Sequence, residues 1–147
     1  MKLFRISLLA TIAVALSVTA APKSLSDGIA GVPWSGSRDE FRHAIPSLAC
    51  APIACRGSWT LHSIHGELEL TWGGFSPVIT SSTFKFSRTA LSEMKRVLKE
   101  ELGAPSRQYT EEGETVTEWT GRGALVDLYH GSKIDGPQLY IEPKRKK

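Results

Sequence analysis

The sequence predicts an α+β protein, a two-layer sandwich in which an antiparallel sheet carries two helices on one face. Three observations support this class. Two segments have helical caps and helical apolar spacing, several others alternate apolar and polar residues, and glycine-containing turns separate the extended segments. The order along the chain is helix, strands, helix, strands, which also suggests a degenerate duplication of a helix followed by a hairpin.

The N-terminus has the three parts of a secretory signal peptide. Lys2 and Arg5 supply positive charge, residues 6–18 are predominantly apolar, and small residues end at Ala20. The apolar run is shorter than the roughly 20 residues that span a bilayer, so we expect no retained membrane anchor. We expect cleavage between Ala20 and Ala21 and a periplasmic or secreted mature protein without a transmembrane segment.

The remaining chain divides into one domain and a short tail. Residues 21–143 have the length and apolar content of a single α+β domain, and residues 144–147 are all basic. Eighteen Lys and Arg oppose fifteen Asp and Glu in the whole chain, but two of the basic residues lie in the leader and four in the tail, which leaves twelve in the domain. The domain is therefore mildly acidic and has no basic stripe interleaved with aromatics, so we expect no nucleic-acid partner.

The first helix is predicted from its cap. Ser37 and Glu40 have the spacing of a capping box, in which each side chain bonds to the backbone of the other residue. We expect the helix to run to about Ala44 and to be stopped by Pro46, because the residue before proline resists helical geometry. Residues 21–32, which precede the helix, are polar and contain glycine, and we expect them to form an extended lead-in.

Cys50 and Cys55 are the two cysteines of the chain. In an exported protein they predict a local disulfide that staples residues 51–54. One alternative is a tetrahedral zinc site with His62 and His65, and another is a pair of free or intermolecular thiols. Zinc fingers place about twelve residues between the two ligand pairs, whereas six lie between Cys55 and His62. We therefore expect a disulfide, no metal and no cofactor.

The middle of the chain predicts a hairpin. Residues 67–72 alternate polar and apolar side chains, which is typical of a strand with one buried face. Gly73 and Gly74 follow and favour a tight turn, so we expect a partner strand to begin near Phe75. Residues 79–86 are predicted to be extended.

The second helix is predicted over residues 89–102. Its apolar residues recur at helical spacing, and Gly103 and Pro105 end it. Glycine-containing turns then separate three further extended segments. These segments are residues 115–120, 124–130 and 138–141.

Short motifs at residues 31–40, 102–105 and 118–119 carry a resemblance. They look like the pattern of small periplasmic proteins of unassigned role. In element order the chain is similar to β-lactamase-inhibitor protein and to the small lipoproteins of outer-membrane assembly. The resemblance implies a small exported α+β domain. Those lipoproteins carry an anchoring cysteine that this chain lacks, and no functional residue is carried over.

Large aromatic residues are the candidate binding residues, because aromatic side chains often supply most of the binding energy at interfaces. Trp72 and Phe75 flank the expected turn, and Trp59 and Trp119 complete the set. Nucleophile-elbow, zinc-protease and phosphate-loop motifs are absent from the sequence. We therefore predict a non-catalytic module that binds a protein of the cell envelope, as an inhibitor, immunity factor or assembly accessory.

The alternative is a small envelope hydrolase or a polysaccharide-binding protein. In that case the aromatic residues would form a sugar platform, and acids such as Glu111, Glu112 and Glu114 would supply a catalytic pair. Two carboxylates facing each other across a cleft would indicate the hydrolase. An aromatic patch without such a pair would indicate the protein-binding module, and a purely structural envelope protein would show neither.

Mass spectrometry of the exported chain tests both the signal peptide and the disulfide. We expect the mass of residues 21–147 and no labelling of Cys50 or Cys55 by a thiol reagent until the protein is reduced. A chain that still begins at Met1, or one with two reactive thiols, would contradict the prediction.

Overall fold

The computed structural model describes residues 24–74 and 76–145. The predicted signal peptide, Phe75 and the last two lysines lie outside these ranges. The elements of the first half are β1 (Gly28–Ile29), β2 (Val32–Pro33), α1 (Arg38–Ala44), β3 (Ala49–Cys50), β4 (Ala54–Leu61), β5 (Ile64–Trp72) and β6 (Ile79–Phe86). Those of the second half are the 3-10 helix η1 (Arg88–Ala90), α2 (Leu91–Leu102), β7 (Arg107–Glu111), β8 (Glu114–Thr120), β9 (Ala124–Gly131) and β10 (Gln138–Pro143).

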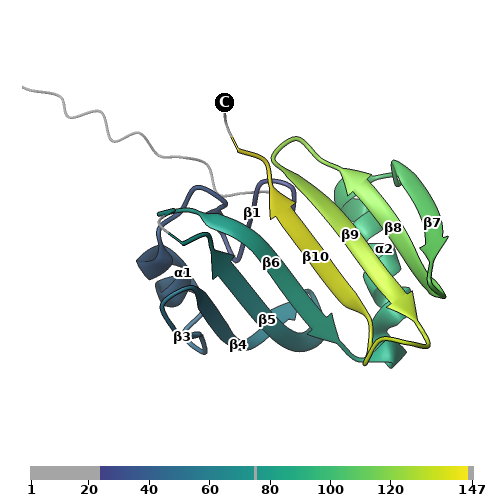
Figure 1. The fold of residues 1–147 in the computed structure, drawn as a ribbon, viewed down its shortest axis with the longest axis horizontal. Helices are drawn as coiled ribbons and strands as arrows, with labels where there is room; N and C mark the ends of the chain where they lie inside the picture. Colours follow the sequence, from purple (N-terminus) through teal and green to yellow (C-terminus); the bar gives the residue numbers. More distant parts are fainter. Residues whose placement is uncertain (1–23, 75, 146–147) are drawn as a thin grey trace, which may run out of the picture.

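Eight strands form one antiparallel sheet in the order β3-β4-β5-β6-β10-β9-β8-β7 (Figure 1). Each helix is followed by four strands that pair in chain order, β3 to β6 after α1 and β7 to β10 after α2. The two four-stranded halves meet where the last strand of each, β6 and β10, pair antiparallel. The element order is therefore the same in both halves.

The α+β class is confirmed, with two α-helices and a sheet that is larger than expected. A separate two-stranded sheet of β1 and β2 adds to it, so a simple two-layer description is incomplete. The expected repeat of a helix and a hairpin corresponds to a repeat of a helix and four strands. Within the described ranges, neither helix combines the length and the apolar character needed to cross a bilayer.

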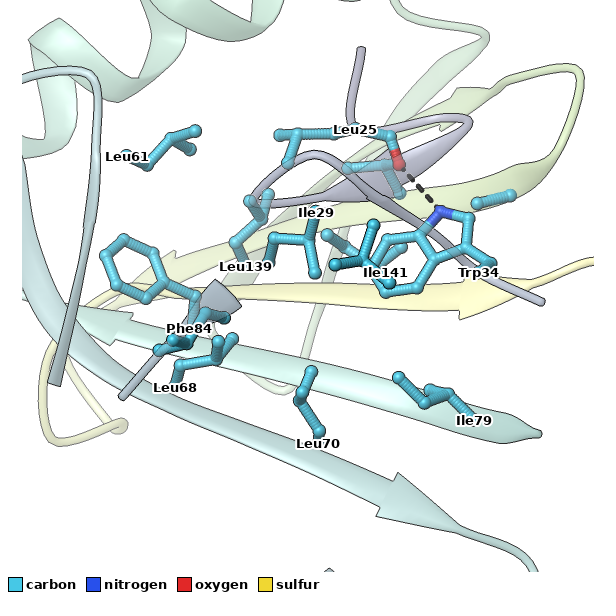
Figure 2. Close-up of a cluster of buried hydrophobic side chains, with 14 of the residues drawn as sticks. Leu25, Ile29, Trp34, Leu61, Leu68, Leu70, Ile79, Phe84, Leu139 and Ile141 are labelled. Atoms are coloured by element: carbon cyan, nitrogen blue, oxygen red, sulfur yellow. Dashed lines mark hydrogen bonds between the residues drawn. The ribbon is translucent and has the colours of Figure 1, made fainter. Parts of the chain in front are cut away.

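One face of the large sheet forms the hydrophobic core (Figure 2). Side chains alternate along a strand, so the buried residues of neighbouring strands point to the same side. On this side Leu68, Phe84 and Leu139 lie opposite one another on β5, β6 and β10 and are at most 1% exposed. The same cluster contains Phe41 of α1 and Met94 of α2, both fully buried. Both helices therefore pack on this face of the sheet.

The cap and extent of α1 are confirmed. The Ser37 hydroxyl accepts a bond from the Glu40 amide at 3.3 Å, and the Glu40 carboxylate accepts one from the Ser37 amide at 2.6 Å. Hydrogen bonds to the Glu40 carboxylate from the backbone and then the side chain of Ser37 lower the pKa of Glu40. The helix ends at Ala44, two residues before Pro46.

The segment that precedes α1 is not the extended lead-in that the sequence suggested. Leu25 and Ile29 lie in the core at 3% and 2% exposure. Ala30 and Gly31 have φ angles of 51° and 78° and form the two-residue turn between β1 and β2. The Trp34 indole nitrogen donates to the Leu25 carbonyl at 3.0 Å, which ties the segment together (Figure 2). Two scattered apolar residues anchor a segment that is otherwise polar in composition.

The expectation that a partner strand begins near Phe75 was wrong. Trp72 pairs with Ile79, so β6 begins at Ile79 and a longer loop replaces the tight Gly73-Gly74 turn. A register shift between Thr71 and Trp72 and the missing N–H of Pro77 explain why pairing begins later. The extended segment 79–86 itself is confirmed.

Two edge strands were not predicted. β7 lies between the predicted second helix and the extended segment predicted at residues 115–120, and Glu112 and Gly113 form its turn to β8 with φ angles of 50° and 87°. At the opposite edge β3 pairs with β4, and Cys50 lies directly opposite Cys55. These two cysteines form the expected disulfide. Because the two sulfurs are bonded to each other, neither is a thiolate ligand for zinc.

Candidate functional site

Among the described residues, no helix packs on the second face of the eight-stranded sheet. Figure 1 looks onto this face, with α2 behind β8 and β9. We call it the open face and define it by the residues of β4 to β10 that alternate with the core residues. Paired in register, its central row is Arg56, Glu69, Thr83, Tyr140, Asp127, Glu118 and Arg107.

The two ends of this row each carry an arginine bonded to a glutamate. Arg56 on β4 donates to Glu69 on β5, and the Nε and Nη2 atoms of Arg107 on β7 both donate to Oε2 of Glu118 on β8, at 3.1 and 3.0 Å. These bonds to Glu118 raise the pKa of Arg107. Arg107 also lies over the ring of Tyr109, 4.8 Å from its centroid.

The β7–β10 half of the open face contains buried residues although no helix covers it. Val116 is 2% exposed and lies outside the main core, and Asp127 is 6% exposed. Val116 pairs with Tyr109 and Tyr129, and Asp127 pairs with Tyr140. We name the three half-buried tyrosines, with Val116 and Asp127 among them, the tyrosine cluster.

Asp127 is the buried ionisable group of this cluster. Its Oδ2 atom lies 3.5 Å from the Tyr129 hydroxyl, and its Oδ1 atom is buried without a hydrogen-bond partner among the described residues. Burial raises the pKa of Asp127, and the like charges of Glu118 and Glu142 add to the increase. The Tyr129 hydroxyl and Arg107 oppose it.

Tyr129 responds to the same surroundings. Burial, followed by the negative charge of Asp127, raises the pKa of Tyr129 to about 12. The phenol therefore stays protonated near neutral pH and is a hydrogen-bond donor there. The tyrosine cluster can hold a hydrogen-bond donor or a positive charge beside Asp127. An anion would be repelled by Glu118 and Glu142 and by Asp127 when it is ionised.

The hollows on the open face are lined largely by charged and polar side chains. One lies over β4, β5, β6 and β10, and a second lies near the chain end beside Tyr140 and Glu142. Neither hollow includes Asp127 or Glu118. Small-molecule sites are usually more apolar, so this face has the form of a surface for a larger partner. The first hollow is lined by Arg56, Glu67, Glu69, Thr83, Lys85 and Gln138.

The carboxylates of this face do not meet across a cleft. Asp127 and Glu118 are direct neighbours on adjacent strands, and Glu67 and Glu69 lie on one strand. Glu111 and Glu112 are exposed, at the end of β7 and in its turn to β8. Glu114 accepts a bond from the Lys133 amide at 2.7 Å and helps to hold the loop before β10. The arrangement expected of a hydrolase is not found among these residues.

The aromatic residues singled out from the sequence lie elsewhere. Trp72 and Trp119 are core residues at 3% and 5% exposure, and Trp59 is half-buried with its ring 5.3 Å from that of Phe84. Phe75 lies outside the described residues. The structure therefore does not bring these four rings together on one surface. Their role in binding stays a prediction, and the burial of two of them directs the search to the open face.

Both core tryptophans have evident packing roles. The Trp119 indole nitrogen donates to the Gly103 carbonyl at 3.1 Å, which joins β8 to the end of α2. Trp72 packs edge-on against Phe41, and the Arg38 guanidinium lies 4.7 Å from its ring. Packing of this kind agrees with the usual position of tryptophan in small cores.

The histidines do not form a site with the cysteines. His62 lies in the β4–β5 turn with a φ of 53°, and its Nε2 atom is 2.7 Å from Glu101 on α2. His65 lies on β5 and its ring bonds to Thr60 at 2.7 Å. In residues 24–74 and 76–145, no three His, Cys, Asp or Glu side chains are grouped closely enough to hold a metal ion.

Sequence reasoning missed Asp127 and the three tyrosines. Residues 124–130 were predicted to be extended, and in that segment Ala124, Val126 and Leu128 alternate with Leu125, Asp127 and Tyr129. The alternation places Asp127 between Leu125 and Tyr129 on the same face of the strand. This pattern was the signal in the sequence that could have pointed to the site. Its neighbours Glu118 and Tyr140 come from other strands and are identified only by the register.

Comparisons with known proteins give little further information. No family model matches the chain, and no curated protein matches it. A solved structure of YjgB, a DUF4309 family protein from Bacillus subtilis, is similar with 11% identity and a TM-score of 0.47, covering 74% of this chain and 79% of that one. This similarity is too low for an inference about function. The resemblance to β-lactamase-inhibitor protein and to assembly lipoproteins stays a prediction.

The raised pKa of Asp127 predicts a specific pH dependence of stability. The folded protein holds the Asp127 proton more tightly than the unfolded chain, whose Asp127 has the ordinary pKa of 3.8. The unfolding free energy therefore falls as the pH rises from that value through the higher pKa of the folded state. Asp127→Asn should therefore gain stability relative to wild type between pH 3 and pH 7, by on the order of 1 kcal/mol. Urea unfolding at several pH values measures the difference.

The control is Asp135→Asn, which changes an exposed carboxylate in the loop before β10. Its stability difference from wild type should be flat across the same pH range. A flat difference for Asp127→Asn as well would contradict the account of Asp127 as a buried, unpaired acid.

Proposed function

We propose that the chain is an exported, non-catalytic module that binds a protein of the cell envelope through the open face of its sheet. The observation that carries this proposal is the tyrosine cluster. It buries Val116 and an unpaired Asp127 on the side of the sheet that has no helix. The side chains of the sheet itself bury both residues, and Val116 lies outside the main hydrophobic core.

The composition of the open face supports a protein partner. Tyrosine and arginine are enriched at protein interfaces, and the β7–β10 half presents Tyr109, Tyr129, Tyr140 and Arg107. The half formed by β4 to β6 presents mixed charges around a hollow. A broad, mostly flat surface of this kind favours a folded partner over a small ligand.

The sheet edges are less suited to binding by strand addition. β3 at one edge has two residues, and β7 at the other has five and begins and ends with the charged residues Arg107 and Glu111. Short and charged edge strands discourage pairing with another chain. We therefore place the binding surface on the face of the sheet.

Export is a second part of the proposal. The disulfide is compatible with an oxidising compartment. Residues 1–20 support export because they have the three parts of a secretory signal peptide.

Site-specific photo-cross-linking tests the proposed surface in cells that produce the full chain. A photoreactive amino acid replaces Lys85, which is exposed on the open face, or Lys99, which is exposed on α2. We expect a protein adduct from position 85 and none from position 99. The pair is matched because both positions are exposed lysines in regular secondary structure.

Equal adducts from both positions, or none from either, would overturn the open face as the binding surface. An adduct to polysaccharide at position 85 would overturn the protein partner and favour the carbohydrate alternative. Thermal unfolding of both variants confirms beforehand that each protein is folded.

A further inference from the structure

Asp127 lacks the partner that a buried carboxylate normally has. Its Oδ1 atom has no hydrogen bond within the described part of the chain, and its Oδ2 atom has one long contact of 3.5 Å with Tyr129. Buried charges are usually paired, because leaving one unpaired carries a large desolvation cost. The remaining sources of a partner are an ordered water molecule and a group outside the fold.

The charges near Asp127 determine the kind of partner. Glu118 lies opposite it on β8, and Glu142 lies two residues from Tyr140 on β10. Both carry the same charge as Asp127. Arg107 on β7 donates two hydrogen bonds to Glu118. Two acids therefore lie near Asp127, and Arg107 is hydrogen-bonded to one of them, Glu118. The negative charge of this group of carboxylates attracts a cation.

The aromatic surroundings suit an organic cation. Tyr140 on β10 pairs with Asp127 on β9. Tyr129 lies two residues after Asp127 on the same face of β9. Tyrosine rings stabilise ammonium and guanidinium groups placed over their faces. A metal ion is less well matched, because no group of three metal-binding side chains occurs in the described ranges. A guanidinium group also has the fork geometry to bond two neighbouring carboxylates such as Asp127 and Glu118.

We propose that Asp127 is the receptor for an arginine or lysine side chain of the partner protein, which docks among Tyr129, Tyr140 and Glu118. This inference rests on the proposed function and specifies the chemistry of its partner. The docked cation pairs with the Asp127 carboxylate and replaces the missing hydrogen-bond donor. Because Oδ1 is covered in the unbound protein, docking requires a side-chain movement in the tyrosine cluster.

The other half of the sheet shows how a carboxylate of the same row is paired within the domain. Glu69 stands in the same central row as Asp127, on β5 of the first half, which occupies the position of β9 in the second. Its side chain is 36% exposed and is already paired with Arg56. Glu69 therefore already has a cationic partner within the domain, whereas Asp127 has none among the described residues.

Selection of peptides displayed on phage against the immobilised protein tests the proposal without a known partner. We expect enriched peptides that share an arginine or lysine. Their affinity should fall at least about tenfold for Asp127→Asn and change little for Asp135→Asn, which removes an exposed charge in the loop before β10. Thermal unfolding of each variant checks that the protein remains folded.

A double-mutant cycle then identifies the contact. The conserved arginine of a selected peptide is replaced by citrulline, which has nearly the same shape and no charge. The replacement should cost at least about tenfold in affinity for wild type and little for Asp127→Asn, because each change removes the same ion pair.

The outcomes separate this inference from the proposed function. Peptides that bind wild type and Asp127→Asn equally, or that share no basic residue, would overturn Asp127 as a cation receptor and leave the protein-binding module intact. Equal citrulline penalties for both proteins would also overturn it. Failure to select any binding peptide on the folded protein would overturn both proposals.

Discussion

The pairing of β6 with β10 is the interaction on which the rest of the structure depends. It joins two four-stranded halves, each with its own α-helix, into one sheet. In this pairing Leu139 lies opposite Phe84 on the core side, and Tyr140 lies opposite Thr83 on the open face. The same register therefore makes both the core and the open face continuous across the junction. A slip of one residue would exchange the two sets of side chains between the faces.

Placing both helices on one side divides the sheet into a packed face and a solvated face, and polar residues suffice on the solvated one. The half formed by β4 to β6 follows this rule, with glutamates, Lys85 and Arg56 around a hollow. The other half departs from it, because three tyrosines surround a buried valine and a buried, unpaired aspartate. Burying an unpaired acid costs stability, and this cost is the basis of the proposal that the cluster binds a partner.

Much of the fold could be predicted from local patterns, because those patterns have local physical causes. The Ser37–Glu40 capping box and the apolar stripe of α2 each specify a helix without help from the rest of the chain. The start of β6 could not be predicted, since the shift at Thr71 arises from strand pairing. The tryptophan residues were ambiguous because composition does not distinguish a core ring from an exposed one. The candidate site was hidden because Asp127, Glu118 and Tyr140 become neighbours only through the register of β8, β9 and β10.

The central claim is that the open face is the functional surface, and methyl NMR of the protein with its cross-linked partner tests it most directly. Val116 and Leu125 carry methyl groups on the open face, whereas Leu91 and Ala44 lie on the helices. The account predicts that adding the partner broadens or shifts the Val116 and Leu125 signals and leaves those of Leu91 and Ala44 unchanged. Changes confined to the helix methyl groups, or to Ile53 and Val78 in the exposed loops, would contradict it.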